Sequence, residues 1–363
     1  MNRDIFEDLF VLEMANNHLG KVDRGLRIIM EHSQMVRFNN VRGAIKLQIR
    51  DVDAFIHKDF RDRTDIRYIK KTLDTRLTKD EYAVLVDSIR KSSCTPMATP
   101  FDEKSVDLCT ELGIPILKVA SSDINDWPLI EKIARTKKPV IASTGGTSLK
   151  DLDDLVSFFE NRHVPLAINH CVSLYPTEDR DLELNQIDFL LNRYPHHTIG
   201  FSTHEFSDWT SSMMIAYAKG ARTFERHIDV EFDGVKMSPY CSSAEQIDVW
   251  FKAYHKAREM CGGSPTTRVV NSDKEISYLN ALVRGVYAKK DMPEGYVILY
   301  ENMEEDVYLA IPLQKGQISC RELMSGEILL KPCAKDQPIM IDMIDSPYAS
   351  TPSLKSIIYN RGI

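Results

Sequence analysis

The chain has 363 residues, 43% hydrophobic and 27% charged, with a net charge of −7 at pH 7. This composition is typical of a globular protein with more than one domain. The acidic balance argues against nucleic acid or a membrane surface as partner. No apolar run approaches the ~20 residues that span a bilayer. The N-terminus lacks a signal-peptide pattern and the seven cysteines include no C-x-x-C pair, so we expect a cytoplasmic protein with reduced thiols.

Short apolar runs that favour β-strands alternate with amphipathic stretches of helical length. The candidate strands are 10–14, 44–48, 94–98, 116–120, 140–143, 166–170, 198–202 and 223–227. The stretches between them include 24–35, 79–92, 103–112, 149–160 and 207–219. Strand alternating with helix indicates parallel βα units. Eight such units predict a (β/α)₈ TIM barrel of the α/β class, although an open doubly wound sheet fits the same alternation.

The pattern changes after the eighth unit. A Gly-Gly-Ser-Pro cluster at 262–265 and the polar stretch after it predict a linker over 261–278. Residues 279–345 contain short strand-like pieces separated by turns, which predicts a small β-rich domain. Residues 346–363 form a polar tail, with Pro347 and Pro352, for which no element is predicted. The barrel domain is therefore placed at 1–260.

Polar residues lie within the carboxyl-terminal part of the candidate strands or just beyond it, in chain order. They are Glu13, Lys46, Gln48, Thr99, Lys118, Ser121, Asp123, Ser143, Ser173, Tyr175, Ser202, His204, Glu225 and His227. The carboxyl ends of barrel strands form the face that carries active sites. We therefore expect these side chains to share one barrel mouth.

Two lysines suggest an anion site. Lys46 and Lys118 each lie inside an apolar strand, where an unpaired ammonium group would be costly. With the hydroxyl groups and a Gly-Gly turn at 145–146, they are typical of a phosphate or carboxylate site. The alternative is that the lysines form structural ion pairs with Glu13 or Asp123.

Two histidines suggest a metal site. His204 and His227 lie at the ends of the last two strand-like runs, and imidazole is the commonest side-chain metal ligand. Two imidazoles in one barrel mouth predict a divalent cation. The alternative for each is a core imidazole with satisfied hydrogen bonds.

These motifs, in this order, resemble those of the sialic acid synthase family. The resemblance covers about residues 8–343. It rests on E-M-A-N-N-H-L-G at 13–20, K-L-Q at 46–48, A-T-P-F-D at 98–102, K-V-A-S-S-D at 118–123, S-T-G-G at 143–146, H-C-V-S-L-Y-P at 170–176, G-F-S-T-H at 200–204 and E-R-H at 225–227. The segment 279–345 resembles the antifreeze-like (SAF) domain that follows the barrel in this family.

The resemblance implies an enzyme that condenses phosphoenolpyruvate with an N-acetylmannosamine-like sugar to give a 2-keto-3-deoxy nonulosonic acid and phosphate. It implies that His204 and His227 bind the metal, Mn²⁺ or Mg²⁺, and act in catalysis with Glu13. The implied phosphoenolpyruvate-binding residues are Lys46, Thr99, Lys118, Ser121, Ser143, Ser173 and Ser202. The implied sugar-binding residues are Gln48, Asp123 and Tyr175. A domain-swapped homodimer is also implied, in which the C-terminal domain caps the partner's barrel.

The sugar half of the pattern departs from the family. The aspartate expected after the eighth strand has no clear counterpart, and that region offers Lys236, Ser238 and Tyr240. Residues 307–313, Val-Tyr-Leu-Ala-Ile-Pro-Leu, lack the family's arginine, and Thr203 replaces an aspartate. We therefore expect an acceptor other than plain N-acetylmannosamine. The alternatives are the same chemistry on another aldose, as in 3-deoxy-octulosonate 8-phosphate synthases, or a non-catalytic sugar-binding relative.

Overall fold

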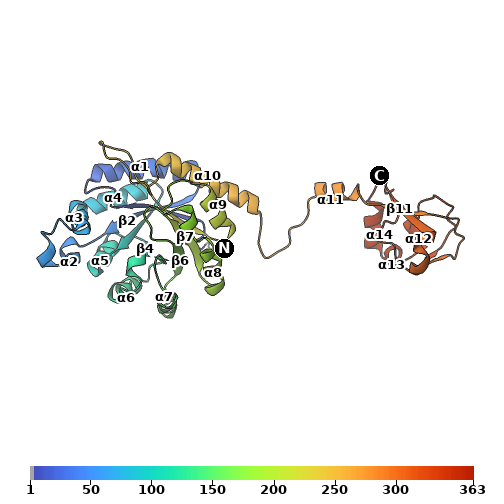
Figure 1. Cartoon of the computed structure of the whole chain (residues 1–363), viewed down its shortest axis with the longest axis horizontal. Coiled ribbons are helices and arrows are strands. Elements are labelled where there is room, and N and C mark those ends of the chain that lie inside the picture. Colours follow the sequence, from blue (N-terminus) through green and yellow to red (C-terminus); the bar gives the residue numbers. More distant parts are fainter. Residues whose placement is uncertain (1–3) are drawn as a thin grey trace. The chain divides into compact units, whose positions relative to one another are not determined.

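The protein consists of two compact units in a computed structural model that describes residues 4–363 (Figure 1). The first unit extends to Gly262 and the second is Gly263–Ile363. The first three residues of the predicted domain 1–260 lie outside the described residues. None of the helices in residues 4–363 has the length and apolar character needed to cross a lipid bilayer.

The first unit is a closed barrel of eight parallel strands in sequential order, which confirms the predicted (β/α)₈ fold. The strands are β1 (Leu9–Ala15), β2 (Arg42–Ile49), β3 (Thr95–Pro100), β4 (Ile116–Val119), β5 (Val140–Ser143), β6 (Leu166–Cys171), β7 (Thr198–Thr203) and β8 (Thr223–His227). The surrounding helices are α1 (Val22–Phe38), α4 (Lys79–Lys91), α5 (Glu103–Glu111), α6 (Trp127–Arg135), α7 (Leu149–Asn161), α8 (Asn185–Arg193), α9 (Ser211–Ala218) and α10 (Ala244–Cys261).

The alternation of side chains along each strand creates two cores and one polar end. On β1, Phe10 and Leu12 belong to the large core that also contains the helices. Leu9 and Val11 belong to a separate apolar cluster formed with alternate residues of neighbouring strands. Glu13 continues the second series toward the carboxyl end of β1. The barrel interior is therefore apolar at its amino end and becomes polar where the strands end.

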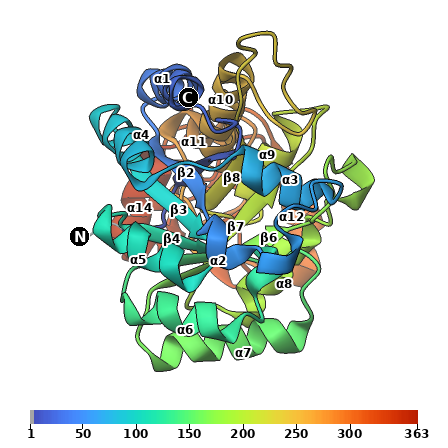
Figure 2. The same cartoon turned by 90° about the vertical axis from the view of Figure 1, so that its left-hand side faces the viewer.

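The connection between β2 and α4 is the longest on the carboxyl side of the barrel. It contains the short helices α2 (Val52–Phe55) and α3 (Arg67–Asp74), which lie in front of the strands in Figure 2. The side chain of Asp51 caps α2 by accepting from two backbone N–H groups. Long loops at this end of a barrel commonly carry substrate contacts.

The second unit contains two small antiparallel sheets around an apolar core. Its elements are α11 (Asp273–Asn280), β9 (Gly285–Ala288), β10 (Val297–Ile298), α12 (Met303–Asp306), β11 (Val307–Ala310), β12 (Glu327–Leu329), β13 (Ile344–Asp345), α13 (Pro347–Ser350) and α14 (Pro352–Tyr359). The sheet orders are β10-β12-β13 and β11-β9.

The C-terminal segment is folded, although no element is predicted for it from sequence. Both prolines stand in the first turns of α13 and α14, where a missing N–H group costs nothing. Ile358 joins the core of the unit and Arg361 pairs with Glu322 at 2.8 Å. Residues 346–363 are thus part of the second unit.

Candidate active site

The predicted site residues lie at the carboxyl ends of the barrel strands. On β1, Glu13 lies opposite Lys46 of β2 and His227 of β8. On β7, Ser202 lies opposite Glu225 of β8. The others are Gln48 on β2, Thr99 on β3, Lys118 on β4, Ser121 and Asp123 in the turn after β4, Ser143 on β5, Ser173 and Tyr175 beyond β6, and His204 beyond β7.

Four buried charged side chains form one ionic cluster. The Nζ of Lys46 lies 2.5 Å from a carboxylate oxygen of Glu13 and 2.7 Å from one of Glu225. The Nζ of Lys118 lies 2.7 Å from the other Glu225 oxygen. Both lysines therefore have carboxylate partners, and for Lys118 that partner is Glu225 instead of Asp123. Two positive and two negative charges balance.

Burial and charge act in opposite directions within this cluster. Burial is the main cause that lowers the pKa of Lys46 to about 7; Lys118 acts in the same direction and Glu225 against it. Burial alone would raise the pKa of Glu225, but Lys118 and Lys46 hold it below its usual value. Charges interact strongly in such an enclosed place, so an arriving anion would compete with Glu225 for both ammonium groups.

The two predicted metal ligands lie side by side. The ring centroids of His204 and His227 are 5.2 Å apart. The Nδ1 of His204 donates to the carbonyl oxygen of Val172 at 3.0 Å, which leaves the Nε2 lone pair free. The Nδ1 of His227 is buried and has no hydrogen-bond partner in the described part of the chain. The alternative of two satisfied core imidazoles therefore does not describe His227.

Both imidazoles are neutral at physiological pH. Burial lowers the pKa of His204 to about 4. Burial, His204 and Lys46 hold the pKa of His227 well below its usual value. Metal binding requires the neutral form of histidine. Within residues 4–363, no group of three or more His, Cys, Asp or Glu side chains is arranged to hold a metal, so a cation here would take its other ligands from water or substrate.

Two tyrosines border the histidines. The ring centroid of Tyr175 lies 3.9 Å from that of His204 and 6.0 Å from that of His227. Tyr240, from the connection between β8 and α10, lies 5.3 Å from both His227 and Tyr175. The Tyr175 side chain is 55% exposed. It is therefore placed to contact both the histidine pair and a molecule that enters from solvent.

A tight turn after β5 brings hydroxyl groups and backbone N–H groups together. The N–H of Gly145 donates to the Ser121 hydroxyl at 3.0 Å. A Cβ atom on Gly145 would lie 2.1 Å from the Ser173 hydroxyl oxygen, so only glycine allows this approach. The Ser143 hydroxyl is buried without a hydrogen-bond partner within residues 4–363. These groups match the small polar donors of an anion cradle.

Arg50 joins the predicted sugar-binding residues, and sequence reasoning missed it. Both of its terminal nitrogens donate to the side-chain oxygen of Gln48 at 3.1 Å. The Gln48 amide nitrogen is thereby turned toward Glu13, at 3.4 Å. The guanidinium also lies 3.7 Å from the ring centroid of Phe101. Its position two residues after Gln48 is the only signal, and that signal does not reveal the contact.

Burial also distinguishes Asp123 from an ordinary surface carboxylate. It raises the pKa of Asp123 to about 6, against the hydrogen bond from Ser122 and the charge of Arg50. One Asp123 oxygen is buried without a hydrogen-bond partner within residues 4–363. A sugar hydroxyl would satisfy it, because a carboxylate prefers such a donor.

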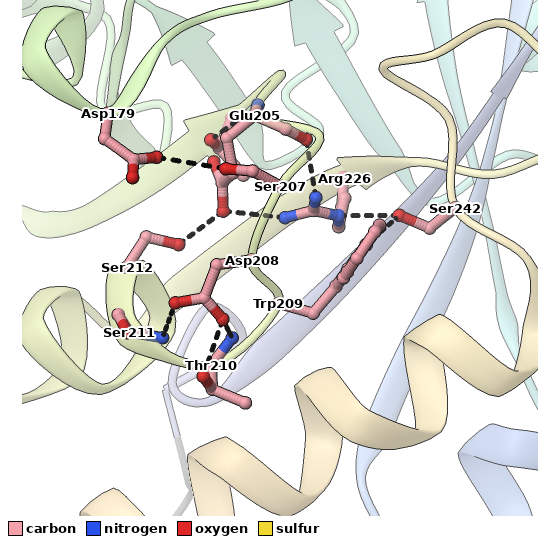
Figure 3. Close-up of polar contacts among 11 residues, drawn as sticks. Asp179, Glu205, Ser207, Asp208, Trp209, Thr210, Ser211, Ser212, Arg226 and Ser242 are labelled. Carbon is pink, nitrogen blue, oxygen red and sulfur yellow. Dashed lines mark hydrogen bonds and ion pairs between the residues drawn. The ribbon is translucent and has the colours of Figure 1, made fainter.

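A second buried ion pair joins the residues next to the two histidines in sequence and was also missed. Figure 3 shows Arg226, between Glu225 and His227 in sequence, paired with Glu205, the residue after His204. Their side chains are each 1% exposed and 2.7 Å apart. The signal was present: a charged residue inside an apolar strand needs a partner, the same reasoning that drew attention to the lysines.

Comparison with known proteins shows which family this chain resembles. A sequence profile of the NeuB family matches residues 40–246. An uncharacterized protein of Methanocaldococcus jannaschii is 30% identical over 321 residues, which are 85% of this chain and 90% of that protein. The N-acetylneuraminate-9-phosphate synthase of Drosophila melanogaster is 28% identical over 229 residues, 61% of this chain and 60% of that enzyme.

A solved structure from Chromobacterium violaceum, provisionally assigned as a spore coat polysaccharide biosynthesis protein E, is similar over almost the whole chain. Its identity is 37% and its TM-score 0.88, covering 93% of this chain and all of that one (100%).

Proposed function

Because the chain belongs to the NeuB family, we propose that this enzyme condenses phosphoenolpyruvate with a sugar aldehyde in a metal-dependent reaction. The reaction consumes one water molecule to break the bond to phosphate, and the products are a 2-keto-3-deoxy nonulosonic acid and inorganic phosphate. One observation carries the proposal: a buried pair of lysines and a neutral pair of histidines meet in a single barrel mouth. The first pair suits an anionic substrate and the second a divalent cation.

Phosphoenolpyruvate would bind where Lys46 and Lys118 converge. Its carboxylate and phosphate would take hydrogen bonds from the two ammonium groups, from the hydroxyl groups of Thr99, Ser121, Ser143, Ser173 and Ser202, and from the turn at Gly145. This fixes the position of C3, the carbon that attacks the aldehyde, before the acceptor arrives. Because Glu13 and Glu225 already neutralise the lysines, the site needs additional positive charge to hold a polyanion.

The donor set fits a divalent cation. His204 and His227 are neutral and adjacent, Val172 orients the His204 ring, and the buried Nδ1 of His227 lacks a hydrogen-bond partner within residues 4–363. When bound, Mn²⁺ or Mg²⁺ would supply Lewis-acid polarisation of the aldehyde oxygen and the missing positive charge. The two imidazoles would hold it at the edge of the anion site.

Glu13 is placed to handle protons on the acceptor side. It is buried, contacts Lys46 at 2.5 Å and receives a hydrogen bond from Gln48 at 3.4 Å. It also lies opposite His227 in register. As the new carbon–carbon bond forms, the aldehyde oxygen becomes an alcohol and takes up one proton. The water consumed in releasing phosphate supplies that proton, and we assign its relay to Glu13, whose ionised carboxylate can accept a proton and pass it on.

The acceptor sugar would lie over Gln48, Asp123 and Tyr175. Arg50 and Tyr240 extend this surface. Asp229, an acidic residue soon after β8, is engaged with Arg24 at 2.7 Å and so does not replace the family aspartate at the sugar. Because of these changes, we expect the enzyme to prefer an acceptor whose substituents differ from those of N-acetylmannosamine.

The test is release of phosphate from phosphoenolpyruvate with a panel of acetamido, diacetamido and unacetylated aldoses. We expect release that depends on the aldose and on a divalent cation, and that His227→Ala abolishes without loss of fold. Release that persists in full after exhaustive chelation would remove the metal from the account. Absence of release across the panel, with phosphoenolpyruvate and metal bound, would favour a non-catalytic relative.

A further inference from the structure

Arg226 occupies a position that the proposed reaction does not use directly. On β8 it lies between Glu225, which faces the two lysines, and His227. Side chains alternate along a strand, so Arg226 points out of the barrel toward the helices. There it is 1% exposed. Burying a guanidinium group is expensive unless its hydrogen bonds are made with good geometry.

The guanidinium makes three well-formed contacts (Figure 3). One terminal nitrogen donates to the Glu205 carboxylate at 2.7 Å, and the other donates to the Glu205 backbone carbonyl at 2.6 Å. The Nε donates to the Ser242 hydroxyl at 2.7 Å. That hydroxyl also accepts from the indole N–H of Trp209 at 2.8 Å. One side chain thus joins the end of β7, β8 and the connection to α10.

The two charged residues of this network, Glu205 and Arg226, are each one residue from a proposed metal ligand. Glu205 follows His204, and Arg226 precedes His227. The backbone N–H of Ser242 donates to the His227 carbonyl at 2.9 Å. The His204 ring has its own hydrogen bond to Val172, whereas the His227 Nδ1 has none within residues 4–363. The position of His227 therefore depends on ring packing against Tyr175 and Tyr240 and on its backbone, which β1 pairing, Ser242 and the anchored side chain of the preceding Arg226 hold.

We propose that the Arg226–Glu205 ion pair is a positioning device that sets the spacing and direction of His204 and His227 for one divalent cation. This inference rests on the two-histidine metal site of the proposed function. Arg226 and Glu205 are positioning residues, because neither touches the substrate or the metal. A planar, forked donor that grips one residue through both side chain and backbone fixes orientation better than a point charge.

The test is to titrate the full-length protein with Mn²⁺ and to measure the dissociation constant in two ways. Isothermal titration calorimetry gives it directly, and the electron paramagnetic resonance signal of free Mn²⁺ gives it independently. Arg226→Met should raise the Mn²⁺ dissociation constant at least tenfold. Arg226→Lys keeps the charge but not the fork and should give a smaller rise. Ser242→Ala removes the acceptor of Arg226 Nε and of the Trp209 indole N–H, leaves both Arg226–Glu205 contacts in place, and should raise the constant a few-fold. The rank of these three effects is itself part of the inference.

A matched control separates positioning from general loss of stability. Leu155 is fully buried in α7, which follows β5 and has no part in this network. Leu155→Ala should lower the thermal midpoint of the barrel and leave the Mn²⁺ dissociation constant unchanged. If Arg226→Met does not fold, Arg226→Lys and Ser242→Ala still test the positioning role. Arg226→Lys keeps a charged donor beside Glu205, and Ser242→Ala keeps both contacts between Arg226 and Glu205.

Two results would overturn the inference, and they differ in what else they overturn. If His227→Ala abolishes Mn²⁺ binding while the foldable variants among Arg226→Met, Arg226→Lys and Ser242→Ala bind Mn²⁺ as tightly as the unaltered protein, the positioning role is wrong and the metal site stands. If His227→Ala binds Mn²⁺ normally, or the unaltered protein does not bind it, the metal site of the proposed function fails together with the inference.

Discussion

Lys118 tests whether the buried lysines bind substrate or serve only as structural ion-pair partners, because Glu225, at 2.7 Å, is its one carboxylate partner within residues 4–363. Lys118→Met should weaken phosphoenolpyruvate binding by ~30-fold or more. The variant loses a charge-assisted contact in an enclosed site and leaves Glu225 less neutralised. Isothermal titration calorimetry with phosphoenolpyruvate measures this directly.

The same experiment has two comparison variants. Lys46→Met should act in the same direction as Lys118→Met. Lys79→Met removes an exposed lysine that lies 2.5 Å from Glu111, and it should leave phosphoenolpyruvate affinity unchanged because exposed pairs contribute little. Unchanged affinity in both site variants would mean that the lysines serve only as structural partners of Glu13 and Glu225.

The buried carboxyl group of Glu327 should make the stability of the second unit depend on pH. Burial raises the pKa of this carboxyl from 4.5 to about 7. Between those values the folded state keeps a proton that the unfolded chain has lost, so stability falls as pH rises. Glu327→Gln should remove that fall and raise the local free energy of unfolding at pH 8 by roughly 1–3 kcal/mol.

Hydrogen exchange of amides in β9 and β12 reports on this unit without interference from the barrel. The exchange free energies are compared at pH 5 and pH 8 in the original protein and in Glu327→Gln. Glu301→Gln, at an exposed position, is the control and should keep the original pH dependence. If the exchange free energy changes between pH 5 and pH 8 by the same amount in the original protein and in Glu327→Gln, the assignment of the raised pKa is contradicted.

At the scale of single elements, the barrel strands were predictable because buried parallel strands read as short apolar runs. The ends of those strands were predictable too. Leu9, Val11 and Glu13 share one side of β1, so a polar residue at the end of an apolar run marks the mouth. The ionic cluster and the adjacent histidines therefore lie where the sequence pattern indicated.

Other contacts depend on folding that brings distant segments together. The partner of Lys118 is Glu225, which lies 107 residues away, and spacing along the chain does not reveal that choice. The contact between Arg50 and Gln48 is local by contrast, because the two residues are two apart at the end of β2, but this spacing alone does not show that the Arg50 side chain turns to Gln48. No element is predicted over α13 and α14, although a proline stands in the first turn of each and proline commonly begins helices.

The connection between β8 and α10 carries the prediction about acceptor specificity. It places Tyr240 against Tyr175 and His227 and offers Lys236 and Ser238 in place of the family aspartate. Buried polar groups left unpaired cost roughly 1–3 kcal/mol each. With two family contacts missing, kcat/KM for N-acetylmannosamine should be ~10- to 10⁴-fold below that of the preferred acceptor.

Parallel kcat/KM measurements with N-acetylmannosamine, its 6-deoxy and diacetamido relatives, and unacetylated aldoses check this. Each sugar is used at saturating phosphoenolpyruvate and metal, so that only the acceptor varies. If N-acetylmannosamine proves the best acceptor at ordinary enzymatic efficiency, the changes in this connection are neutral and the prediction is wrong.

At the scale of the whole molecule, we propose that the second unit is the antifreeze-like domain and that it caps the barrel of a partner subunit. Each unit has its own apolar core. A chain without residues 263–363 should therefore keep the thermal midpoint of the barrel but lose at least tenfold in kcat/KM. Light scattering should give a dimer for the full chain. A full-length monomer together with full activity of the truncated barrel would refute the cap.

The most direct test of the central claim follows the carbon atoms. Phosphoenolpyruvate labelled with ¹³C at C3 is incubated with the full-length enzyme, Mn²⁺ and the most active aldose, itself labelled with ¹³C at C1. Condensation predicts a one-bond ¹³C–¹³C coupling in the product, with one phosphate released per coupled pair. Label that appears only in pyruvate, or stays entirely in phosphoenolpyruvate across the whole panel of aldoses, would contradict the account.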